Sequence, residues 1–191
     1  VFLGGITSGY FADQIVDEYR FIDGVLKGHA EGAILSLISA LEAGDPMGGV
    51  SNLVHIDPDG AVRDNTKVPG LCHAPMPPLD SLVYADLSVM RHPEVYAQSF
   101  GFPLAYGREY SRVDNRNMLS MGRAFFPLFI GRGCPWQCTF CGGNRDTLRR
   151  VNGTNKVQWR THDAVIDDIR RAMDFGYQTM ALCFDPTPMR D

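Results

Sequence analysis

The sequence predicts an α/β fold, and three observations support this prediction. Short apolar runs occur at residues 1–5, 21–27, 124–130 and 178–184, as expected for buried strands. The first three of these runs are each followed, directly or after a loop, by a segment with apolar residues at helical spacing. An alternation of strands and helices is typical of a parallel sheet with helical crossovers.

The N-terminal part is expected to contain two strand–helix pairs. The strand at residues 1–5 ends at Gly4 and Gly5, and Ser8 is expected to cap the helix that follows. The apolar face of that helix comprises Phe11, Ile15, Val16 and Tyr19. The strand at residues 21–27 precedes a second helix, which ends at Gly44. Its predicted apolar stripe comprises Ile34, Leu35, Ile38 and Leu41.

A hairpin and an irregular connector are expected next. Residues 50–64 contain two apolar runs around Asp57-Pro58-Asp59-Gly60, a sequence that suits a tight turn. Prolines interrupt residues 66–122, which are therefore predicted to be a connector with one short helix near residues 92–99.

The C-terminal part repeats the strand–helix–strand order. A buried strand at residues 124–130 leads directly into a loop with three cysteines. Thr161 is expected to cap the next helix, which ends at Gly176 and precedes a strand at residues 178–184. The residues predicted to share one face of that helix are Val165, Ile166, Ile169, Ala172 and Met173. The cysteines therefore follow the carboxyl end of a strand, where parallel α/β folds place their chemistry.

Composition and charge exclude several classes of protein. The net charge of −4 argues against an electrostatic nucleic-acid binder, and no apolar run has the length of a membrane span. The basic residues Arg145, Arg149, Arg150 and Lys156 are interrupted by polar residues, so we expect a solvated loop there. We expect a cytoplasmic protein. The opening residues resemble the inside of a strand, so we also expect a fragment that lacks its beginning and is inactive alone.

Three of the five cysteines, Cys134, Cys138 and Cys141, fall in the glycine-rich segment GRGCPWQCTFCGG with the spacing C-x3-C-x2-C. Three interpretations are open. The thiols can be inert and structural, but such cysteines normally lie in apolar, regular segments. They can bind structural zinc, with the fourth ligand from His162, Cys183 or Cys72 at an unusual spacing. They can also hold a [4Fe–4S] cluster with one iron left open for another ligand.

The cysteine segment resembles the signature of radical S-adenosylmethionine (SAM) enzymes, C-x3-C-x-aromatic-C, with Phe140 as the aromatic residue. The resemblance implies a [4Fe–4S] cluster held by the three cysteines, with SAM on the open iron. One electron from the cluster cleaves SAM to a 5′-deoxyadenosyl radical in that family. Phe140, Gly142, Gly143 and Asp185 are the implied SAM contacts, although Asp185 suits a simple turn or helix cap equally well.

The N-terminal half resembles the last part of a cobalamin-binding domain. The resemblance rests on GGIT at residues 4–7, the strand FIDGVLKG at residues 21–28 and the Leu-rich helix segment at residues 29–44. It implies that Gly4, Gly5, Thr7, Gly28 and Glu31 line the cobalamin site. Glycine permits the close approach of backbone to ligand that such a site needs.

Three departures limit this resemblance. Only Gly28 and Glu31 match the expected G-E-G-E-like turn. The Asp-x-His-x-x-Gly segment that supplies a histidine to cobalt in some relatives is missing, and so is the Gly-Gly-Glu motif after the second barrel strand. His29 is expected to be a partly exposed turn residue.

The resemblance implies three regions. Residues 1–48 form the C-terminal part of a Rossmann-like cobalamin-binding domain, residues 49–122 a hairpin and Pro-rich connector, and residues 123–191 the first βαβ unit of a partial TIM barrel. The implied function is cobalamin-dependent radical SAM chemistry, with SAM methylating cobalamin and an unactivated carbon receiving the methyl group.

Two alternatives remain: cyclisation or rearrangement without methylation, and a non-enzymatic iron–sulfur or zinc module. The implied partners are a small, natural-product-like substrate and an electron donor such as flavodoxin or ferredoxin.

Overall fold

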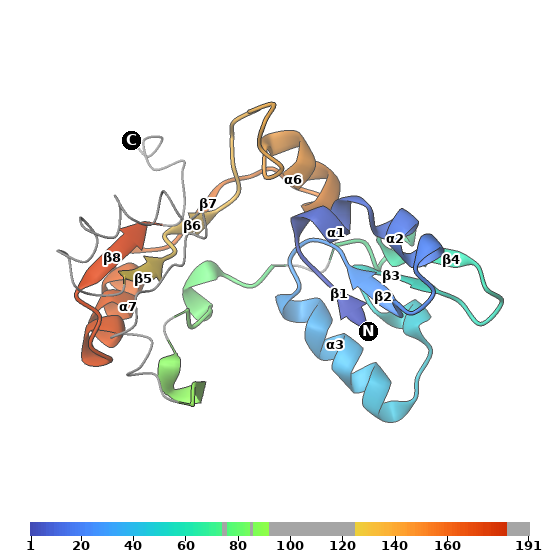
Figure 1. Ribbon diagram of the computed structural model, residues 1–191, viewed down its shortest axis with the longest axis horizontal. Helices are drawn as coiled ribbons and strands as arrows, with labels where there is room; N and C mark the ends of the chain where they lie inside the picture. The colour runs from blue at the N-terminus through green and yellow to red at the C-terminus, as the bar shows by residue number, and fades with distance from the viewer. Residues whose placement is uncertain (74–75, 85, 92–124, 183–191) are drawn as a thin grey trace, which may run out of the picture. The chain divides into compact units, whose positions relative to one another are not determined.

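The computed structural model of the chain describes residues 1–73, 76–84, 86–91 and 125–182 (Figure 1). The chain divides into two compact units. The first comprises Val1–Pro78 and Gly133–Val157, and therefore includes the cysteine loop. The second comprises Leu79–Arg132 and Gln158–Asp191.

The first unit is built on a four-stranded sheet in the order β1-β2-β3-β4. Strands β1 (Phe2–Leu3) and β2 (Gly24–Leu26) are parallel, as the sequence predicts. The predicted hairpin is also present, as β3 (Leu53–Ile56) and β4 (Val62–Asp64). Strand β3 pairs antiparallel with β2, so the hairpin extends the same sheet and the predicted division at residue 48 falls between paired strands. The three predicted regions stay a prediction.

The first helical segment differs from the sequence-based expectation. It consists of two short helices, α1 (Ile6–Tyr10) and α2 (Ala12–Glu18). Ser8 is not the cap, because the helix already begins at Ile6 and the Ser8 hydroxyl donates to the carbonyl of Gly4 at 2.5 Å. Phe11, at the break between the helices, is exposed rather than buried on an apolar face, and so is Tyr19.

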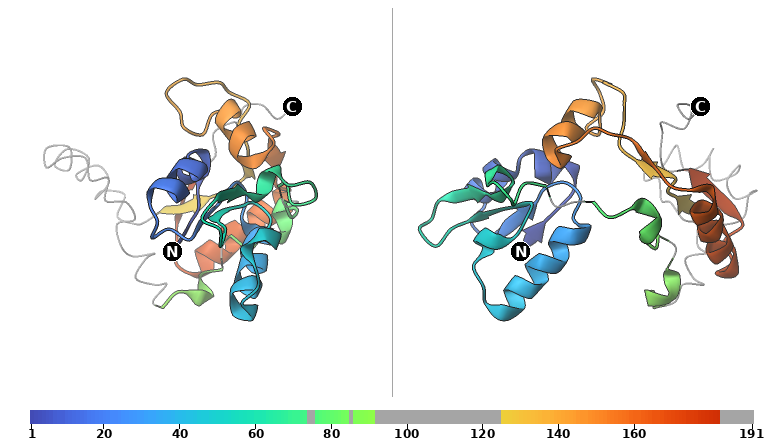
Figure 2. Two further views of the ribbon diagram at one scale, coloured as in Figure 1. Left: turned by 90° about the vertical axis from the view of Figure 1, so that its right-hand side faces the viewer. Right: turned by 180° about the vertical axis from the view of Figure 1, so that it is seen from behind.

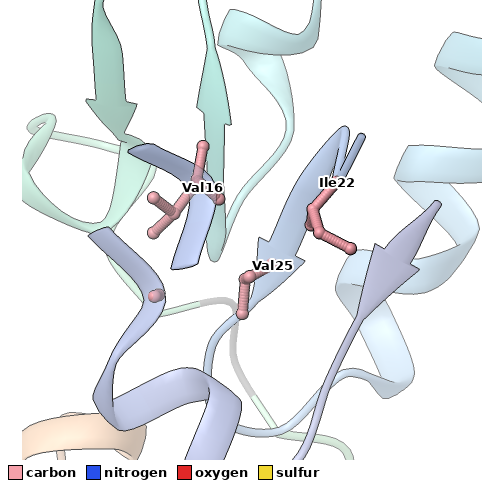
Figure 3. Packing of buried hydrophobic residues seen from close by; sticks show 5 residues of the cluster. Val16, Ile22 and Val25 are labelled. Atoms are coloured by element: carbon pink, nitrogen blue, oxygen red, sulfur yellow. The ribbon is translucent and has the colours of Figure 1, made fainter. Parts of the chain in front are cut away.

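One face of this sheet is covered by α2. Its core contains Val16 from α2, Ile22 and Val25 from the β2 segment, and Val54 from β3 (Figure 3). Since side chains alternate along a strand, Val25 and Val54 face α2 while their neighbours Leu26 and Leu53 face the other side. The register confirms this, because Val25 lies opposite Val54 and Leu26 lies opposite Leu53.

The other face is covered by α3 (Glu31–Ala43). Gly44 ends this helix in the left-handed conformation, as predicted. The predicted apolar stripe is wrong: Ile34, Leu35, Ile38 and Leu41 are exposed. The sheet instead contacts Ala33, Leu37 and Ala40. These residues also recur at helical spacing, and the two alanines let the helix approach the sheet more closely.

A further helix, α6 (Arg145–Asn152), directly follows the cysteine loop. The segment expected to be a solvated loop is helical at Arg145, Arg149 and Arg150, although these three side chains are exposed, as expected. Leu148 and Val151 give α6 a buried face. Four single-turn 3₁₀ segments complete the described connections: Met47–Gly49, Asn65–Lys67, Leu79–Ser81 and Leu87–Val89.

In the second unit, β5 (Phe125–Leu128) and β8 (Thr179–Leu182) are parallel neighbours (Figure 2). The helix α7 (His162–Asp174) precedes β8 in the chain and packs on β5. The two-residue strands β6 (Gly131–Arg132) and β7 (Gln158–Trp159) form a separate antiparallel pair.

The cap of α7 is confirmed, since Thr161 accepts a hydrogen bond from the Ala164 N–H at 3.3 Å. The predicted face is correct in part. Val165, Ile169 and Ala172 contact the core around Phe126, Leu128 and Tyr177. Ile166 and Met173 are exposed. The helix expected near residues 92–99 lies outside the described residues, as does Cys183. Among the described helices, none is both long and apolar enough to cross a bilayer.

Candidate functional site

The residues expected to line a cobalamin site gather at one edge of the first sheet. Strands β1 and β2 are parallel, so the turns at Gly4–Gly5 and at Gly28 follow the same end of the pair. Gly5 and Gly28 have positive φ angles of 98° and 74°, which explains why glycine occupies both turns. Thr7 lies exposed in α1, and Glu31 occupies the first turn of α3. The cobalamin contacts themselves stay a prediction.

The helix α6 contacts this same edge. A Cβ atom added to Gly28 would lie 3.0 Å from the carbonyl oxygen of Val151, and one added to Gly9 would lie 2.8 Å from a Val151 methyl group. The guanidinium carbon of Arg150 lies 4.1 Å from the centre of the Tyr10 ring, in cation–π geometry. The glycines at positions 9 and 28 therefore make room for α6.

The cysteine loop folds back on the start of α6. The N–H of Cys141 donates to the carbonyl of Cys138 at 3.2 Å, and the N–H of Asn144 donates to the carbonyl of Cys141 at 3.3 Å. The N–H of Arg145 reaches back to the carbonyl of Trp136 at 2.8 Å. The loop is thus a series of tight turns, with all three cysteines on one short stretch of backbone.

The thiols of Cys134, Cys138 and Cys141 are free of disulfides. Cys141 is exposed and the other two are half-buried. The N–H of Gly143 points at the Cys141 sulfur at 3.4 Å, which is the kind of contact that tunes a metal-bound thiolate. Phe140, the aromatic residue of the motif, is 92% exposed.

The loop lies beside the Gly4–Gly5 turn. A Cβ atom added to Gly143 would lie 3.6 Å from the Ile6 side chain, and Ile6 is the first residue of α1. The structure therefore places Gly143, a residue expected at SAM, against the residue that follows the Gly4–Gly5 turn, which is expected at cobalamin. Gly142 adjoins this contact, whereas Asp185 lies outside the described residues.

The donor chemistry fits an iron–sulfur cluster, since three free thiols follow one another at the spacing of the motif. The sulfur atoms are not gathered around one point. Within residues 1–73, 76–84, 86–91 and 125–182, no group of three or more His, Cys, Asp or Glu side chains is close enough to hold a metal ion. The fit therefore rests on the chemistry of the residues.

Two features near the site escaped the sequence-based prediction. One is Asn144, whose side chain caps α6; an asparagine ahead of Leu148 and Val151, with Gly153 at the end, is the signal that marks this helix. The other is a charged network next to a pocket of about 380 Å³ at the α1–α2 junction, which Lys27 and Arg150 also line. Lys27 and Asp13 lie far in the sequence from their partners Asp64 and Lys67, so no local signal identifies the whole network.

Asp64 is the centre of that network. Its carboxylate accepts hydrogen bonds from Lys27 at 3.0 Å and from the Thr66 hydroxyl at 2.5 Å, and it pairs with Lys67 at 3.2 Å. Burial alone would raise the pKa of Asp64, but these hydrogen bonds and charges outweigh burial and lower the pKa. Burial also tends to lower the pKa of Lys67, yet its bonds to Asp64 and Asp13 raise it.

Comparison with known proteins gives matches among solved structures alone. No protein-family model matches the chain. No curated protein matches it either. A structure of the radical S-adenosylmethionine methyltransferase TsrM from Kitasatospora setae, with tryptophan substrate and a SAM analogue bound, is 19% identical with a TM-score of 0.56. The match covers 99% of this chain and 30% of that chain.

A second TsrM structure, with cobalamin and a [4Fe–4S] cluster bound, is 21% identical with a TM-score of 0.54, and the match covers 96% and 30% of the two chains. A structure of the cobalamin-dependent SAM radical enzyme OxsB, with aqua-cobalamin and SAM bound, is 17% identical with a TM-score of 0.51. That match covers 95% of this chain and 21% of the OxsB chain. The chain thus spans less than a third of the length of these enzymes. At such identities the likeness shows a shared α/β fold.

Proposed function

We propose that this protein is a cobalamin-dependent radical SAM enzyme that transfers a methyl group to an unactivated carbon. The observation that carries the proposal is the contact between Gly143 of the cysteine loop and Ile6, next to the Gly4–Gly5 turn. Methyl transfer of this kind needs cobalamin and SAM near one another. Ile6 follows the turn that we assign to cobalamin, and Gly143 is assigned to SAM, so their proximity supports the proposal. The likeness to TsrM and OxsB supports the same class of enzyme.

In this proposal, Cys134, Cys138 and Cys141 hold a [4Fe–4S] cluster through their thiolates. When bound, the cluster would supply the electron for reductive cleavage of SAM. The exposed Phe140 ring and the backbone of Gly142 and Gly143 are available to contact SAM beside the cluster. Asp185 is proposed to accept a hydrogen bond from the SAM amine or ribose.

The cobalamin side is assigned to the other set of residues. Gly4, Gly5, Thr7 and Gly28 would line the cobalamin nucleotide tail, and Glu31 would contact it from the start of α3. A small, natural-product-like molecule is the proposed substrate, and a flavodoxin or ferredoxin is the proposed electron donor.

Anaerobic reconstitution with iron and sulfide tests the cluster. We expect a brown protein with a reduced EPR signal that changes when SAM is added, because SAM would occupy the open iron. The triple variant Cys134→Ala/Cys138→Ala/Cys141→Ala should bind no cluster. Cys72→Ala is the matched control, because Cys72 is also a free thiol but lies outside the loop, and it should behave like the wild type. A colourless protein that holds one zinc ion would contradict the proposal.

The methyl-transfer part needs a separate measurement. Protein loaded with both cofactors is incubated with SAM that carries an isotopically labelled methyl group. Label that passes from SAM to the bound cobalamin supports methyl transfer. Formation of 5′-deoxyadenosine without such passage of label would favour radical chemistry without methylation.

A further inference from the structure

The side chain of Asn144 joins the cysteine loop to α6. Its carbonyl oxygen Oδ1 accepts a hydrogen bond from the Thr147 N–H at 3.0 Å, which caps the helix. Its amide nitrogen Nδ2 donates to the carbonyl of Cys138 at 3.1 Å. One contact requires an acceptor and the other a donor, so the orientation of the amide follows from its partners. Aspartate, serine and threonine also cap helices, but each lacks the amide donor.

The helix α6 is anchored by its C-terminal turn, so it offers a fixed element for such a connection. Val151 is 1% exposed and lies against Gly9 and Gly28, and Arg150 stacks on Tyr10. The helix is thereby fixed to the edge of the sheet at which the cobalamin residues are expected. The carbonyl of Cys138 is bound to this helix through Asn144, while it also accepts the N–H of Cys141 within the loop.

We infer that Asn144 is a positioning residue. It holds the backbone of Cys138 at the start of α6, and so sets the position of the cluster relative to the Gly4–Gly5 turn. The inference rests on the proposed function, since it concerns the same cysteine loop. Asn144 acts through the backbone of Cys138, and it is not a ligand in this assignment.

Four variants separate this role from simple helix capping. Asn144→Asp and Asn144→Ser retain an oxygen that can cap α6, but both remove the donor to Cys138. Asn144→Ala removes both contacts. Thr161→Ala is the matched control, because it removes the hydroxyl that caps α7. That hydroxyl oxygen accepts a hydrogen bond from the Ala164 N–H at 3.3 Å. Circular dichroism and urea unfolding establish that each variant is folded.

The first measurement uses the metal-free protein. The rate of alkylation of Cys138 is followed by mass spectrometry, with the exposed Cys72 of the same molecule as the internal reference. We expect the ratio of the two rates to rise about two- to tenfold in Asn144→Asp and Asn144→Ser, as for the loss of one hydrogen bond. Thr161→Ala should keep the wild-type ratio. A wild-type ratio in both Asn144 variants would overturn the inference.

The second measurement uses the reconstituted protein. We expect Asn144→Asp and Asn144→Ser to lose iron to a chelator about two- to tenfold faster than the wild type, and to show an altered EPR response to SAM. Wild-type iron loss and an unaltered EPR response in both variants would overturn the inference. If the wild type itself takes up no cluster, the proposed function fails. The ratio of the Cys138 and Cys72 alkylation rates then still decides whether Asn144 holds the loop, because this ratio is measured without metal.

Discussion

The carbonyl oxygen of Val151 lies so close to Gly28 that a Cβ atom at position 28 would come within 3.0 Å of it. Gly28 follows β2, and Val151 belongs to the helix that follows the cysteine loop. The sequence indicates that Gly28 lets a ligand approach the backbone, and the structure shows that α6 approaches it there. The turn is thus one of the points through which the cysteine loop is held on the sheet.

Gly28→Ala should therefore destabilise the protein for two reasons. A Cβ is unfavourable at the φ of 74°, and it would press on the backbone of α6. Gly44→Ala is a matched control, since Gly44 has a φ of 71° with nothing within 4 Å of an added Cβ. We expect a loss of about 1–2 kcal/mol for Gly44→Ala and about 1–3 kcal/mol more for Gly28→Ala, measured by urea unfolding. Equal losses would contradict the close contact with α6.

The buried pair of Arg160 and Asp168 is expected to dominate the polar interior of the second unit. Arg160 donates from Nη1 to Asp168 at 2.6 Å and to the carbonyl of Phe129 at 2.9 Å. The two residues are 4% and 3% exposed. Asp168→Ala removes the carboxylate that is hydrogen-bonded to the buried guanidinium and leaves Asp80 as a more distant partner at 3.9 Å. We therefore expect a loss of about 3–5 kcal/mol in the free energy of unfolding.

The neighbouring residue supplies the control. Asp167 pairs with Arg170 at 3.1 Å, but both side chains are mostly exposed. Asp167→Ala should cost less than about 1 kcal/mol. Losses of similar size for the two substitutions would contradict the buried character of the Arg160–Asp168 pair.

Local signals in the sequence predicted much of the fold. The hairpin around Asp57-Pro58-Asp59-Gly60, the cap at Thr161 and the end of α3 at Gly44 all depend on neighbouring residues, and all three are confirmed. The spacing of the cysteines also predicts a site without any tertiary information, and that site stays a prediction. The pairing of β3 with β2 depends on contacts distant in the sequence, and it was not predicted.

The sequence-based predictions were wrong where more than one helix face or tertiary partner suited the residue pattern equally well. The segment of α3 is apolar almost all round, so periodicity alone does not decide between Leu35 and Leu37 as the buried residue. The sequence did not predict α6, because the helix has few buried residues, Leu148 and Val151, and its arginines suit an exposed loop equally well. The proximity of Gly143 to Ile6 joins residues far apart in the chain, and no local rule reveals it.

The choice of face on α3 leads to a direct comparison of two leucines. Leu37 is 2% exposed in the core beneath the helix, whereas Leu35 is 66% exposed. Leu37→Ala should cost about 2–5 kcal/mol, because it removes buried apolar surface and leaves a cavity. Leu35→Ala should change the free energy of unfolding by no more than about 0.5 kcal/mol, since surface substitutions usually have small effects. Urea unfolding of both variants measures the two losses. A larger loss for Leu35→Ala than for Leu37→Ala would instead support the apolar stripe predicted from the sequence.

The lowered pKa of Asp64 predicts a pH dependence of stability. The folded state holds this carboxylate ionised through Thr66, Lys27 and Lys67, so the unfolded state binds protons more readily near the ordinary carboxyl value of about 4. The stabilisation is therefore fully present above that value and is lost as the pH falls through the lower pKa of the folded state. Asp64→Asn removes the charge and should cost about 2 kcal/mol at neutral pH.

Urea unfolding of the wild type and Asp64→Asn between pH 7 and pH 2 measures this effect. The difference in the free energy of unfolding should remain constant down to about pH 5 and then shrink as the wild-type carboxylate takes up its proton. Lys27→Met tests the cause, because it removes the hydrogen bond of 3.0 Å that helps to lower the folded-state pKa of Asp64. In that background the pH-dependent loss should be smaller and should be complete at a higher pH. A difference that persists unchanged down to pH 2, with or without Lys27, would contradict the role assigned to Asp64.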